Sequence, residues 1–324
     1  MRVVSLFAGA GGLDLGLIQA GHKIIWANDF DPDSVATYSF NIGKHIVLGP
    51  IEDVPSSEIP DADIIVGGFP CQGFSQANLK RAMDDPRNAL YRQFVRVLSD
   101  KKPKYFIAEN VRGLMSMDSG RAYEIITKGF EESGYRVVTK VLNAADYGVP
   151  QNRHRVIFMG TRIDIPEAAN LIHPEPTHSS QPTADGRLPH LTVGEALALV
   201  PDPVEFPDAV PNQAFSQYKF VERNFTGHRT TDPNKPSPTI LARGNGGGGV
   251  NATPHPNGLR RMSIRESAAI QTFPLNFSFV GRLGSAYRQV GNAVPVGLGR
   301  ALGLAVKSAE ERLQASMSTS ERAA

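Results

Sequence analysis

The chain has 324 residues, of which 41% are hydrophobic and 20% are charged, and its formal net charge is +2. These values are those of an ordinary globular protein that can bury a large core in one domain or two. No apolar run is long enough to cross a membrane, and Met1 and Arg2 lead into an apolar strand rather than a signal peptide. A single cysteine and no export signal therefore predict a reducing, cytoplasmic setting.

Strand-like and helix-like patterns alternate along the first half of the chain. Strands are expected at residues 3–7, 23–27, 64–66 and 105–108, followed by a terminal pair at 136–142 and 155–160. Helices are expected after the glycine-rich turn 8–12, at 34–40 and at 123–133. This alternation predicts an α/β fold with a doubly wound, mostly parallel sheet.

The composition changes after about residue 163. Fourteen of the 24 prolines lie between Pro166 and Pro256, and residues 246–249 are four consecutive glycines. This stretch predicts a loop-rich module inserted into the first domain. Further helices are expected at 193–199, 263–271 and 295–313. The expected domains are 1–166, an insertion over 167–258, and a return to the first domain over 259–324.

The charge of the insertion is uneven. Residues 175–214 carry six acidic residues against Arg187 alone, whereas residues 215–265 carry eight basic residues against two acidic ones. The eight basic residues are Lys219, Arg223, Arg229, Lys235, Arg243, Arg260, Arg261 and Arg265. A basic stretch of this kind predicts a surface that contacts phosphates, and a solvated protein face is the alternative.

Residues 67–75 read GGFPCQGFS and follow the apolar strand 64–66. They include Cys71, the only cysteine of the chain. A lone cysteine is most often a small buried hydrophobe. Here, glycines on both sides permit close approach of the backbone to a ligand, and open α/β sheets bind their ligands at the carboxyl ends of strands. The surroundings of Cys71 therefore favour a nucleophile.

Residues 7–13 read FAGAGGL and lie between a predicted strand and a predicted helix. Glycines at such a place let the backbone approach a ligand at the helix N-terminus. Asp29 ends the next strand, at a distance along the chain that suits the hydroxyls of a ribose. The spacing is not the full dinucleotide motif, so a simple tight turn is an equal alternative.

Three further side chains are placed for chemistry. Glu109 follows the strand 105–108, and in an apolar pocket its pKa would rise so that it could act as an acid; a helix N-terminal carboxylate is the alternative. Arg153 and Arg155 are two residues apart on a predicted strand, so both point to one side and suit a phosphate or carbonyl oxygen, or a solvated edge. The eight histidines lack the spacing of metal ligands, which predicts no metal site.

In this order, the motifs resemble those of the cytosine-5 DNA methyltransferases of bacterial restriction–modification systems. The resemblance covers nearly the whole chain. It rests on segments 7–12, 67–75, 85–90 (DPRNAL), 109–111 (ENV), 151–155 (QNRHR), 265–274 (RESAAIQTFP) and 289–295 (QVGNAVP). It implies a Rossmann-like fold that uses S-adenosyl-L-methionine and carries a small recognition domain as an insertion.

The resemblance also implies a role for each site residue. Cys71 would attack carbon 6 of a cytosine flipped out of the duplex, while Glu109 hydrogen bonds to or protonates nitrogen 3. Arg153 or Arg155 would hold the carbonyl side and the backbone phosphate. Gln72 and Ser75 would contact the substrate. The implied cofactor residues are Phe7, Gly9, Gly12, Leu13, Asp29, Phe30, Ile51, Pro70, Leu90 and Asn292.

The insertion corresponds to the family's recognition domain, and segment 76–90 to a mobile loop that closes over the base. Thr239 resembles the threonine that opens a recognition loop in the family. Arg243, which follows, is the best candidate for reading a guanine, and a phosphate contact or no contact is equally open. One departure concerns Pro50, because relatives commonly have an aspartate before the isoleucine that occupies position 51 here.

The implied partners are double-stranded DNA and a cognate restriction endonuclease, with neither a membrane nor a metal. Two other functions share the motif order: a tRNA cytosine-5 methyltransferase, and a catalytically silent relative that binds DNA. An insertion of about 90 residues favours DNA. The presence of Cys71, Glu109, Arg153 and Arg155 argues for activity.

Overall fold

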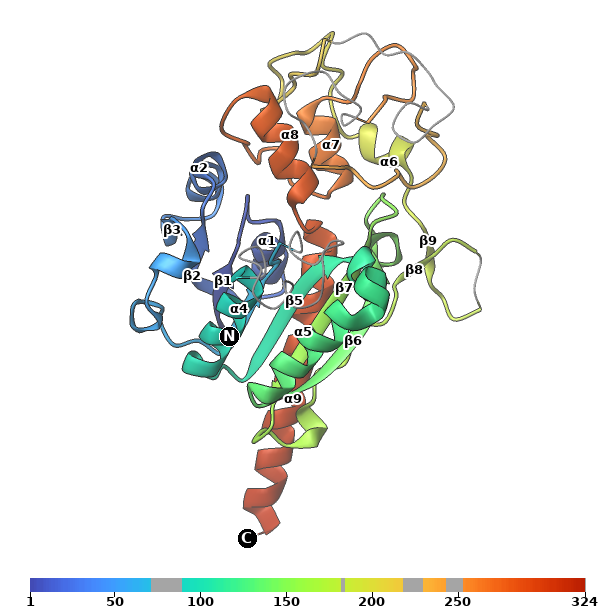
Figure 1. Cartoon of the computed structure of the whole chain (residues 1–324). Helices are drawn as coiled ribbons and strands as arrows, with labels where there is room; N and C mark the ends of the chain where they lie inside the picture. The colour runs from blue at the N-terminus through green and yellow to red at the C-terminus, as the bar shows by residue number, and fades with distance from the viewer. Residues whose placement is uncertain (71–88, 182–183, 218–229, 243–252, 324) are drawn as a thin grey trace.

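The structure is a computed structural model that describes residues 1–70, 89–181, 184–217, 230–242 and 253–323. At the centre of this described part lies one seven-stranded sheet with helices on both faces (Figure 1). Its strands lie in the order β3 (Ile46–Leu48), β2 (Lys23–Asp29), β1 (Arg2–Leu6), β4 (Ile64–Gly67), β5 (Tyr105–Val111), β7 (His154–Arg162) and β6 (Tyr135–Asn143). The first five are parallel, whereas β7 runs antiparallel to both β5 and β6. The predicted mostly parallel α/β sheet is confirmed.

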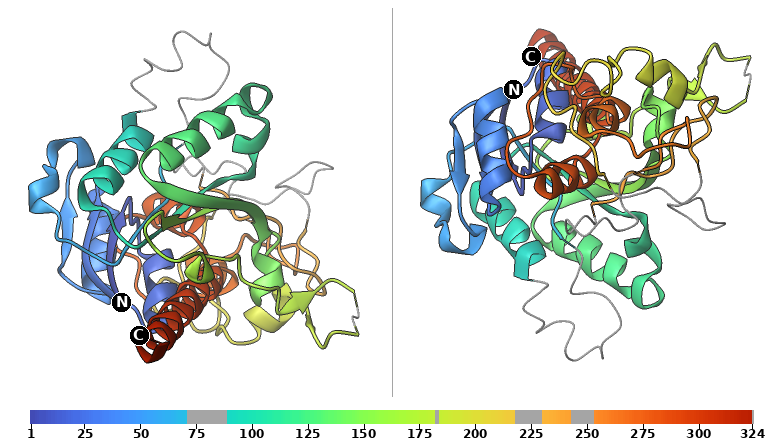
Figure 2. Two further views of the ribbon diagram at one scale, coloured as in Figure 1. Left: turned by 90° about the horizontal axis from the view of Figure 1, so that it is seen from below. Right: turned by 90° about the horizontal axis from the view of Figure 1, so that it is seen from above.

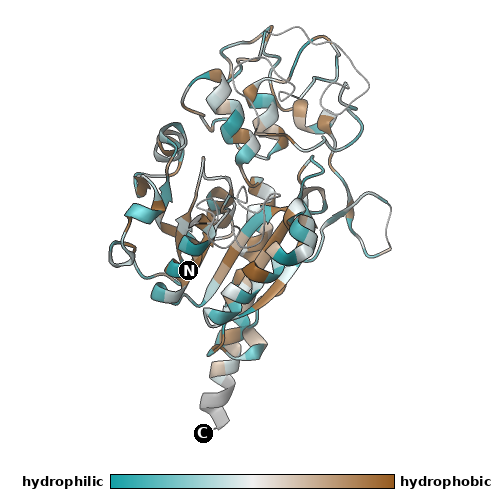
Figure 3. Cartoon of the chain, in the orientation of Figure 1, coloured by the Kyte–Doolittle hydropathy of each residue, from teal (hydrophilic) through white to brown (hydrophobic). Residues whose placement is uncertain are grey.

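Alternate residues of the strands enter two separate hydrophobic layers. Val3 of β1 and Ile107 of β5 belong to the layer formed with α1 (Gly12–Gln19) and α9 (Val296–Ala323). Their neighbours Val4 and Phe106 belong to the layer formed with α4 (Ala89–Lys101) and α5 (Arg121–Glu132). Figure 2 shows these helix pairs on opposite sides of the sheet, and Figure 3 shows that its central strands are mostly hydrophobic. Because both faces are covered, the strands have continuous apolar sequences.

The order of the strands in the sheet changes direction between β1 and β4. From β1 the chain adds β2 and β3 on one side, and β4 then returns to the other side of β1. The carboxyl ends of all five parallel strands lie at the same edge, the upper one in Figure 1. Open α/β sheets bind ligands at such a reversal, outside the carboxyl ends of the strands. Leu6 of β1 is paired with Gly67 of β4, so the first residues after these two strands lie side by side at this place.

A smaller unit lies above this edge of the sheet (Figure 1). It contains α6 (Val193–Leu197), α7 (Ile264–Ile270) and α8 (Leu283–Asn292), which share one hydrophobic cluster that includes Ile240 and Phe273. The domain boundary expected at residue 258 stays a prediction. Because α7 and α8 pack with α6, the structure favours a domain boundary later than residue 258. The chain then rejoins the sheet domain at α9, which packs on α1.

The remaining elements are short. They are α2 (Pro32–Asn41), the two-stranded ribbon of β8 (His178–Ser179) and β9 (Leu188–Pro189), and the 3-10 helices η1 (Ile51–Asp53), η2 (Ser56–Glu58), η5 (Arg112–Gly120), η6 (Ala144–Tyr147) and η7 (Glu167–Ala169). All six expected strands occur, whereas β3, α4 and α8 were not predicted. Among the described residues, none of the helices has the length and apolar character needed to cross a membrane.

Candidate active site

Glycines shape the loop that follows β1. Phe7 and Gly9 both have a φ of +55°, and the N–H of Gly9 donates to Oδ2 of Asp29 at 2.7 Å, which ties this loop to the end of β2. A Cβ built on Gly9 would meet no described atom within 4 Å, so the space beside it is open. Gly12 differs, because its Cβ would lie 2.3 Å from the carbonyl oxygen of Val294. Packing against the start of α9 therefore requires a glycine at position 12.

The end of β2 presents a carboxylate and an exposed aromatic ring. Burial raises the pKa of Asp29, although the N–H groups of Asp31 and Gly9 oppose this by donating to the carboxylate. Phe30 is 65% exposed, which is unusual for a phenylalanine next to a sheet core. An acceptor therefore lies next to the open space at Gly9, and the exposed phenylalanine directly follows it in the chain.

The other predicted cofactor residues are placed around the same edge with different exposure. Leu13 and Ile51 are buried, Pro70 and Leu90 are half-buried, and Asn292 is exposed. Ile51 lies in the hydrophobic layer next to α4, and its carbonyl accepts from Nη2 of Arg96 at 3.0 Å.

Pro50 precedes η1, and the two acidic residues that follow it, Glu52 and Asp53, are both exposed.

The strand β4 leads directly into the segment that carries Cys71. Phe69 is buried among the rings of Tyr91, Phe94 and Phe130, and its carbonyl accepts from Nδ2 of Asn110 at 2.9 Å. The backbone is therefore fixed to β5 two residues before Cys71. The predicted site residues Cys71, Gln72, Ser75 and Arg243 lie outside the described residues, as does segment 76–88 of the predicted closing loop.

Glu109 and Arg155 form an ion pair at the carboxyl end of β5. Glu109 is opposite Ile157 in the antiparallel β5–β7 pair, so Arg155 is its diagonal neighbour on the same face. Nε of Arg155 lies 2.7 Å from Oε1 of Glu109, and each side chain is 12% exposed. A Cβ on Gly68 would lie 3.1 Å from Oε2 of Glu109, which places the pair beside the loop after β4. The carboxylate of Glu109 therefore lies against a guanidinium group rather than in the apolar pocket considered for it.

Arg153 does not share this site with Arg155, which corrects the expectation that both guanidinium groups converge. It precedes β7, is 1% exposed, and donates to the carbonyls of Ile240 at 3.0 Å and Gly291 at 2.9 Å. Burial lowers the pKa of Arg153 to about 9, and the charge of Arg155 acts in the same direction. Arg153 remains protonated at neutral pH, and two of its donors are occupied by backbone carbonyls.

Thr239 also contacts the protein rather than an open surface. Its hydroxyl donates to the carbonyl of Asn152 at 2.8 Å, while the N–H of Asn152 donates to the carbonyl of Ser237 at 2.8 Å. Segment 237–240 of the insertion is therefore joined to residues 150–153. Sequence reasoning assigned no role to Gln151, although this side chain is fully buried in the same contact.

A family model for C-5 cytosine-specific DNA methylases matches residues 1–308 of the chain. The chain belongs to this family. It is a DNA cytosine-5 methyltransferase, an enzyme that places a methyl group on carbon 5 of cytosine with the help of a methyl donor.

Known proteins agree with this assignment. The methyltransferase is 38% identical to the type II methyltransferase M.NgoFVII of Neisseria gonorrhoeae, over 91% of this chain and 83% of that protein. It is 36% identical to the type II methyltransferase M.FnuDI of Fusobacterium nucleatum, over 92% of both chains. The solved structure of the S. pombe Dnmt2 methyltransferase has the same fold, with a TM-score of 0.70, 19% identity and coverage of 95% of this chain and 99% of that one.

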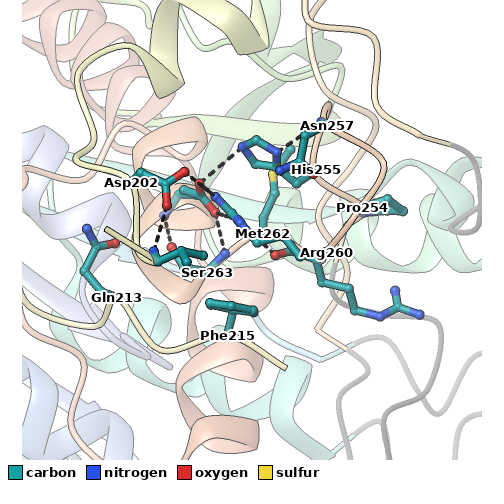
Figure 4. A network of polar contacts seen from close by, with 12 residues as sticks. Asp202, Gln213, Phe215, Pro254, His255, Asn257, Arg260, Met262 and Ser263 are labelled. Atoms are coloured by element: carbon teal, nitrogen blue, oxygen red, sulfur yellow. Dashed lines mark hydrogen bonds and ion pairs between the residues drawn. The ribbon is translucent and has the colours of Figure 1, made fainter. Parts of the chain in front are cut away.

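A buried polar network joins the insertion of the methyltransferase to α7. The carboxylate of Glu266 accepts from Nη1 and Nη2 of Arg260 at 2.7 and 2.8 Å and from the N–H of Ser263 at 2.6 Å. His255 and Asp202 lie at its border, 3.4 Å from Glu266 and 3.5 Å from Arg260 respectively (Figure 4). Burial opposes ionisation of Glu266, but the hydrogen bonds from His255, Arg260 and Ser263 outweigh it and lower its pKa to about 2.

This network changes the interpretation of the basic stretch 215–265. Arg260 is neutralised by Glu266, and Lys235 lies 3.1 Å from Asp232. Arg265 is buried and donates to the carbonyls of Pro211, Pro274 and Phe277. Arg260 and Arg265 do not form the predicted phosphate-contacting surface, because both are buried and held by internal partners, whereas Lys235 is exposed and stays a candidate contact. The basic residues Lys219, Arg223, Arg229 and Arg243 lie outside the described part of the chain.

Within the part of the chain that the structure describes, no group of three or more His, Cys, Asp or Glu side chains is placed to hold a metal ion.

Proposed function

We propose that this methyltransferase uses S-adenosyl-L-methionine to methylate a cytosine within a specific site of duplex DNA, with Cys71 as the nucleophile. The observation that carries the proposal is the Glu109–Arg155 pair, at 2.7 Å, beside the backbone of Gly68. Gly68 lies three residues before Cys71, the only thiol of the chain. Glu109 as the acid, Arg155 as the cation and Cys71 as the nucleophile would therefore lie together near the place where the strand order reverses.

The residues at the end of β1 and β2 fit the proposed cofactor. S-adenosyl-L-methionine supplies an activated methyl group when it is bound. The cofactor would fit into the open space at Gly9, where the backbone can contact it. The Asp29 carboxylate would accept hydrogen bonds from its ribose hydroxyls, and the exposed ring of Phe30 would pack on its adenine. Leu13, Ile51, Pro70, Leu90 and Asn292 stay predicted cofactor residues on the resemblance, as do Phe7 and Gly12.

The proposed chemistry divides among three side chains. The thiolate of Cys71 forms a bond to carbon 6 of the cytosine, which pushes electron density into the ring. Glu109 hydrogen bonds to or protonates nitrogen 3 and so stabilises that density, while Arg155 orients Glu109 and holds the carbonyl oxygen. Carbon 5 can then accept the methyl group. Solvent water then accepts the proton from carbon 5, the bond to carbon 6 breaks with its electron pair on sulfur, and the aromatic ring and the Cys71 thiolate are restored. Nitrogen 3 returns to Glu109 any proton that it took.

Gln72 and Ser75 remain the proposed substrate contacts next to Cys71, and Arg243 the proposed base-reading residue. Thr239 has a different proposed part, because its hydroxyl donates to Asn152. We assign it to holding the start of the recognition loop rather than to touching DNA.

The relatives also support a biological setting. Both are named type II methyltransferases, and the resemblance is to enzymes of restriction–modification systems. We propose that a cognate restriction endonuclease acts on the same DNA site, and that the enzyme works in the cytoplasm, where that DNA is found.

Methyl transfer from radiolabelled S-adenosyl-L-methionine to unmethylated duplex DNA and to tRNA tests the proposal. Wild type should label cytosine carbon 5 of DNA and form a covalent complex with a duplex that contains 5-fluorocytosine, because the fluorine on carbon 5 cannot leave as a proton does. Cys71→Ser should bind S-adenosyl-L-methionine as wild type does but transfer no methyl group and form no covalent complex. Preferential labelling of tRNA, or near-normal turnover by Cys71→Ser, would contradict it. No transfer to either substrate would favour the silent DNA-binding alternative.

A further inference from the structure

Two side chains from the segment before β7 hold both polar backbone groups of Ile240. The N–H of Ile240 donates to Oε1 of Gln151 at 3.0 Å, and its carbonyl accepts from Nη1 of Arg153 at 3.0 Å. Ile240, Gln151 and Arg153 are each at most 2% exposed. Water is excluded from these hydrogen bonds, so a lost partner would leave a buried polar group unsatisfied.

The same two side chains reach the carboxyl end of α8. Nη2 of Arg153 donates to the carbonyl of Gly291 at 2.9 Å. Nε2 of Gln151 donates to Oε1 of Gln271 at 2.9 Å, and Nε2 of Gln271 donates in turn to the carbonyl of Val290 at 2.8 Å. Four segments of the chain, at residues 151–153, 240, 271 and 290–291, are therefore joined through one buried polar cluster.

A second observation places the chain that leaves Ile240. A Cβ built on Gly291 would lie 2.4 Å from the carbonyl oxygen of Leu241 and 2.5 Å from the nitrogen of Ala242. The backbone of residues 241–242 thus lies directly on the backbone of Gly291, at a distance that only glycine allows. The path from Ile240 toward residue 243 is fixed from two sides, by the hydrogen bonds to Ile240 and by this close packing.

The cluster is also connected to the chemical centre. Arg153 is two residues from Arg155, whose Nε lies 2.7 Å from the carboxylate of Glu109. A shift of the backbone at residue 153 would move Arg155 and the segment at 240–242 together. The position of residues 240–242 is therefore coupled to the position of the Glu109–Arg155 pair by a short, buried stretch of chain.

We propose that Gln151 and Arg153 are positioning residues that determine DNA-site specificity by fixing residues 240–242 relative to Glu109 and Arg155. This inference rests on the proposed function, since it concerns the same reaction. The two side chains do not touch the cytosine. They set where the segment that follows Ala242 begins, and so which bases can be contacted while a cytosine lies at the catalytic pair.

The test compares wild type with Gln151→Met and Arg153→Lys on a library of duplexes with randomised sequence, read by cytosine-conversion sequencing. Methionine fills the glutamine's space without its hydrogen bonds, and lysine keeps the charge but cannot reach both carbonyls. Each variant should methylate sites that differ from the wild-type site at one or more positions. We expect the KM for the wild-type site to rise about tenfold or more, with S-adenosyl-L-methionine binding changed less than threefold.

The matched control is Arg136→Lys. Arg136 also donates to a backbone carbonyl, that of Ile163 at 2.8 Å, and to Oδ1 of Asn170 at 2.9 Å, but these contacts lie beside β6, away from the catalytic edge. This variant should lose a similar amount of thermal stability while it methylates only the wild-type site. A merely structural role of Arg153 would give the same behaviour as the control.

Unchanged site preference and KM in both variants, with an active wild type, would overturn the inference and leave the proposed function intact. An inactive wild type would instead defeat the proposed function. Amide hydrogen exchange of the wild-type chain keeps the inference testable if a variant does not fold. The amide hydrogen of Ile240 should exchange as slowly as the amide hydrogens of β5. If it exchanged as fast as an amide in an exposed loop, Gln151 and Arg153 would not hold Ile240 in place and the inference would be refuted.

Discussion

The ion pair between Glu109 and Arg155 is poorly explained by stability alone. A half-buried pair recovers little net free energy, because the Coulomb attraction is offset by the cost of removing both charges from water. The register of β5 and β7 nevertheless places the two groups as diagonal neighbours with Nε 2.7 Å from Oε1. A carboxylate whose orientation is fixed before the substrate arrives needs no reorganisation during the reaction, which is the property expected of a catalytic acid.

We expect Glu109→Gln to lower kcat by about 10²–10⁴, the usual contribution of a positioned acid or base, because the amide cannot give a proton to nitrogen 3. Binding of S-adenosyl-L-methionine, measured by titration calorimetry, should not change, since Glu109 lies across β4 from the glycine loop after β1. Steady-state methyl transfer to the mapped DNA site measures kcat.

Glu310→Gln is the control for this variant, because Glu310 lies 3.0 Å from Lys104 in an ion pair on α9 away from the site. Its kcat should match that of wild type. A Glu109→Gln enzyme with kcat within threefold of wild type would show that Glu109 is not the acid.

At the scale of single elements, one buried carboxylate joins α1 to its neighbours. Asp14 of α1 accepts from the hydroxyl of Ser5 on β1 at 2.7 Å and from the hydroxyl of Tyr38 on α2 at 2.8 Å. Burial raises the pKa of Asp14 to about 6, although both hydrogen bonds act in the opposite direction. The carboxylate orients the start of α1, beneath the glycine loop, at a cost in stability when it is charged.

The pKa of Asp14 predicts how stability depends on pH. Its folded-state pKa of about 6 lies above the ordinary aspartate pKa of 3.8, so the native state holds the proton more tightly than the unfolded chain does. This contribution is fully present below pH 3.8 and is lost as pH rises through 6. From this residue alone, the free energy of unfolding should fall by about 3 kcal/mol over that range.

Urea denaturation of wild type and Asp14→Asn between pH 4 and 7 measures this effect. The difference in unfolding free energy should shift by about 3 kcal/mol in favour of the variant as pH rises, because asparagine does not ionise. Asp61→Asn, which removes an exposed carboxylate, is the control. A constant difference between wild type and Asp14→Asn across this range would show that Asp14 does not titrate there.

At the scale of the whole molecule, the recognition unit is held by more than the insertion itself. Ile240 and Val193, from the insertion, share a hydrophobic cluster with Ile264, Phe273 and Val290, which come later in the chain. The Glu266–Arg260 network adds Asp202 and His255 to the same unit. A recognition segment cut out at residue 258 would leave most of this core behind.

Exchange of residues 167–258 for those of a relative with another DNA site should therefore move the methylated site but lower the melting temperature. Exchange of residues 167–292 should change the methylated site and keep the melting temperature near that of wild type. The reason is that α7 and α8 are then exchanged together with the residues on which they pack. Conversion sequencing of methylated DNA and thermal denaturation measure the two effects. If neither chimera changed the site, specificity would lie outside this unit.

The sequence predicted the site best where chemistry depends on local order. The Gly-Gly-Phe-Pro-Cys run after an apolar strand, and Glu109 after another, could be placed at one edge because parallel strands end on the same side. The sequence could not predict in this way which side chains lie next to each other on neighbouring strands. The Glu109–Arg155 contact requires that β7 runs antiparallel to β5 in one particular register, with Glu109 opposite Ile157.

By itself, then, the sequence determined the fold class, the order of the strands along the chain and the identity of the chemical groups. These follow from local pattern: apolar runs make buried strands, and glycines mark turns that leave room for a ligand. Only the tertiary structure separated Arg153 from Arg155, neutralised Arg260 with Glu266 and joined Gln151 to Ile240. The physical reason is that a buried charge or amide takes whichever partner the packing brings to it, and those partners come from 6 to 138 residues away in the chain.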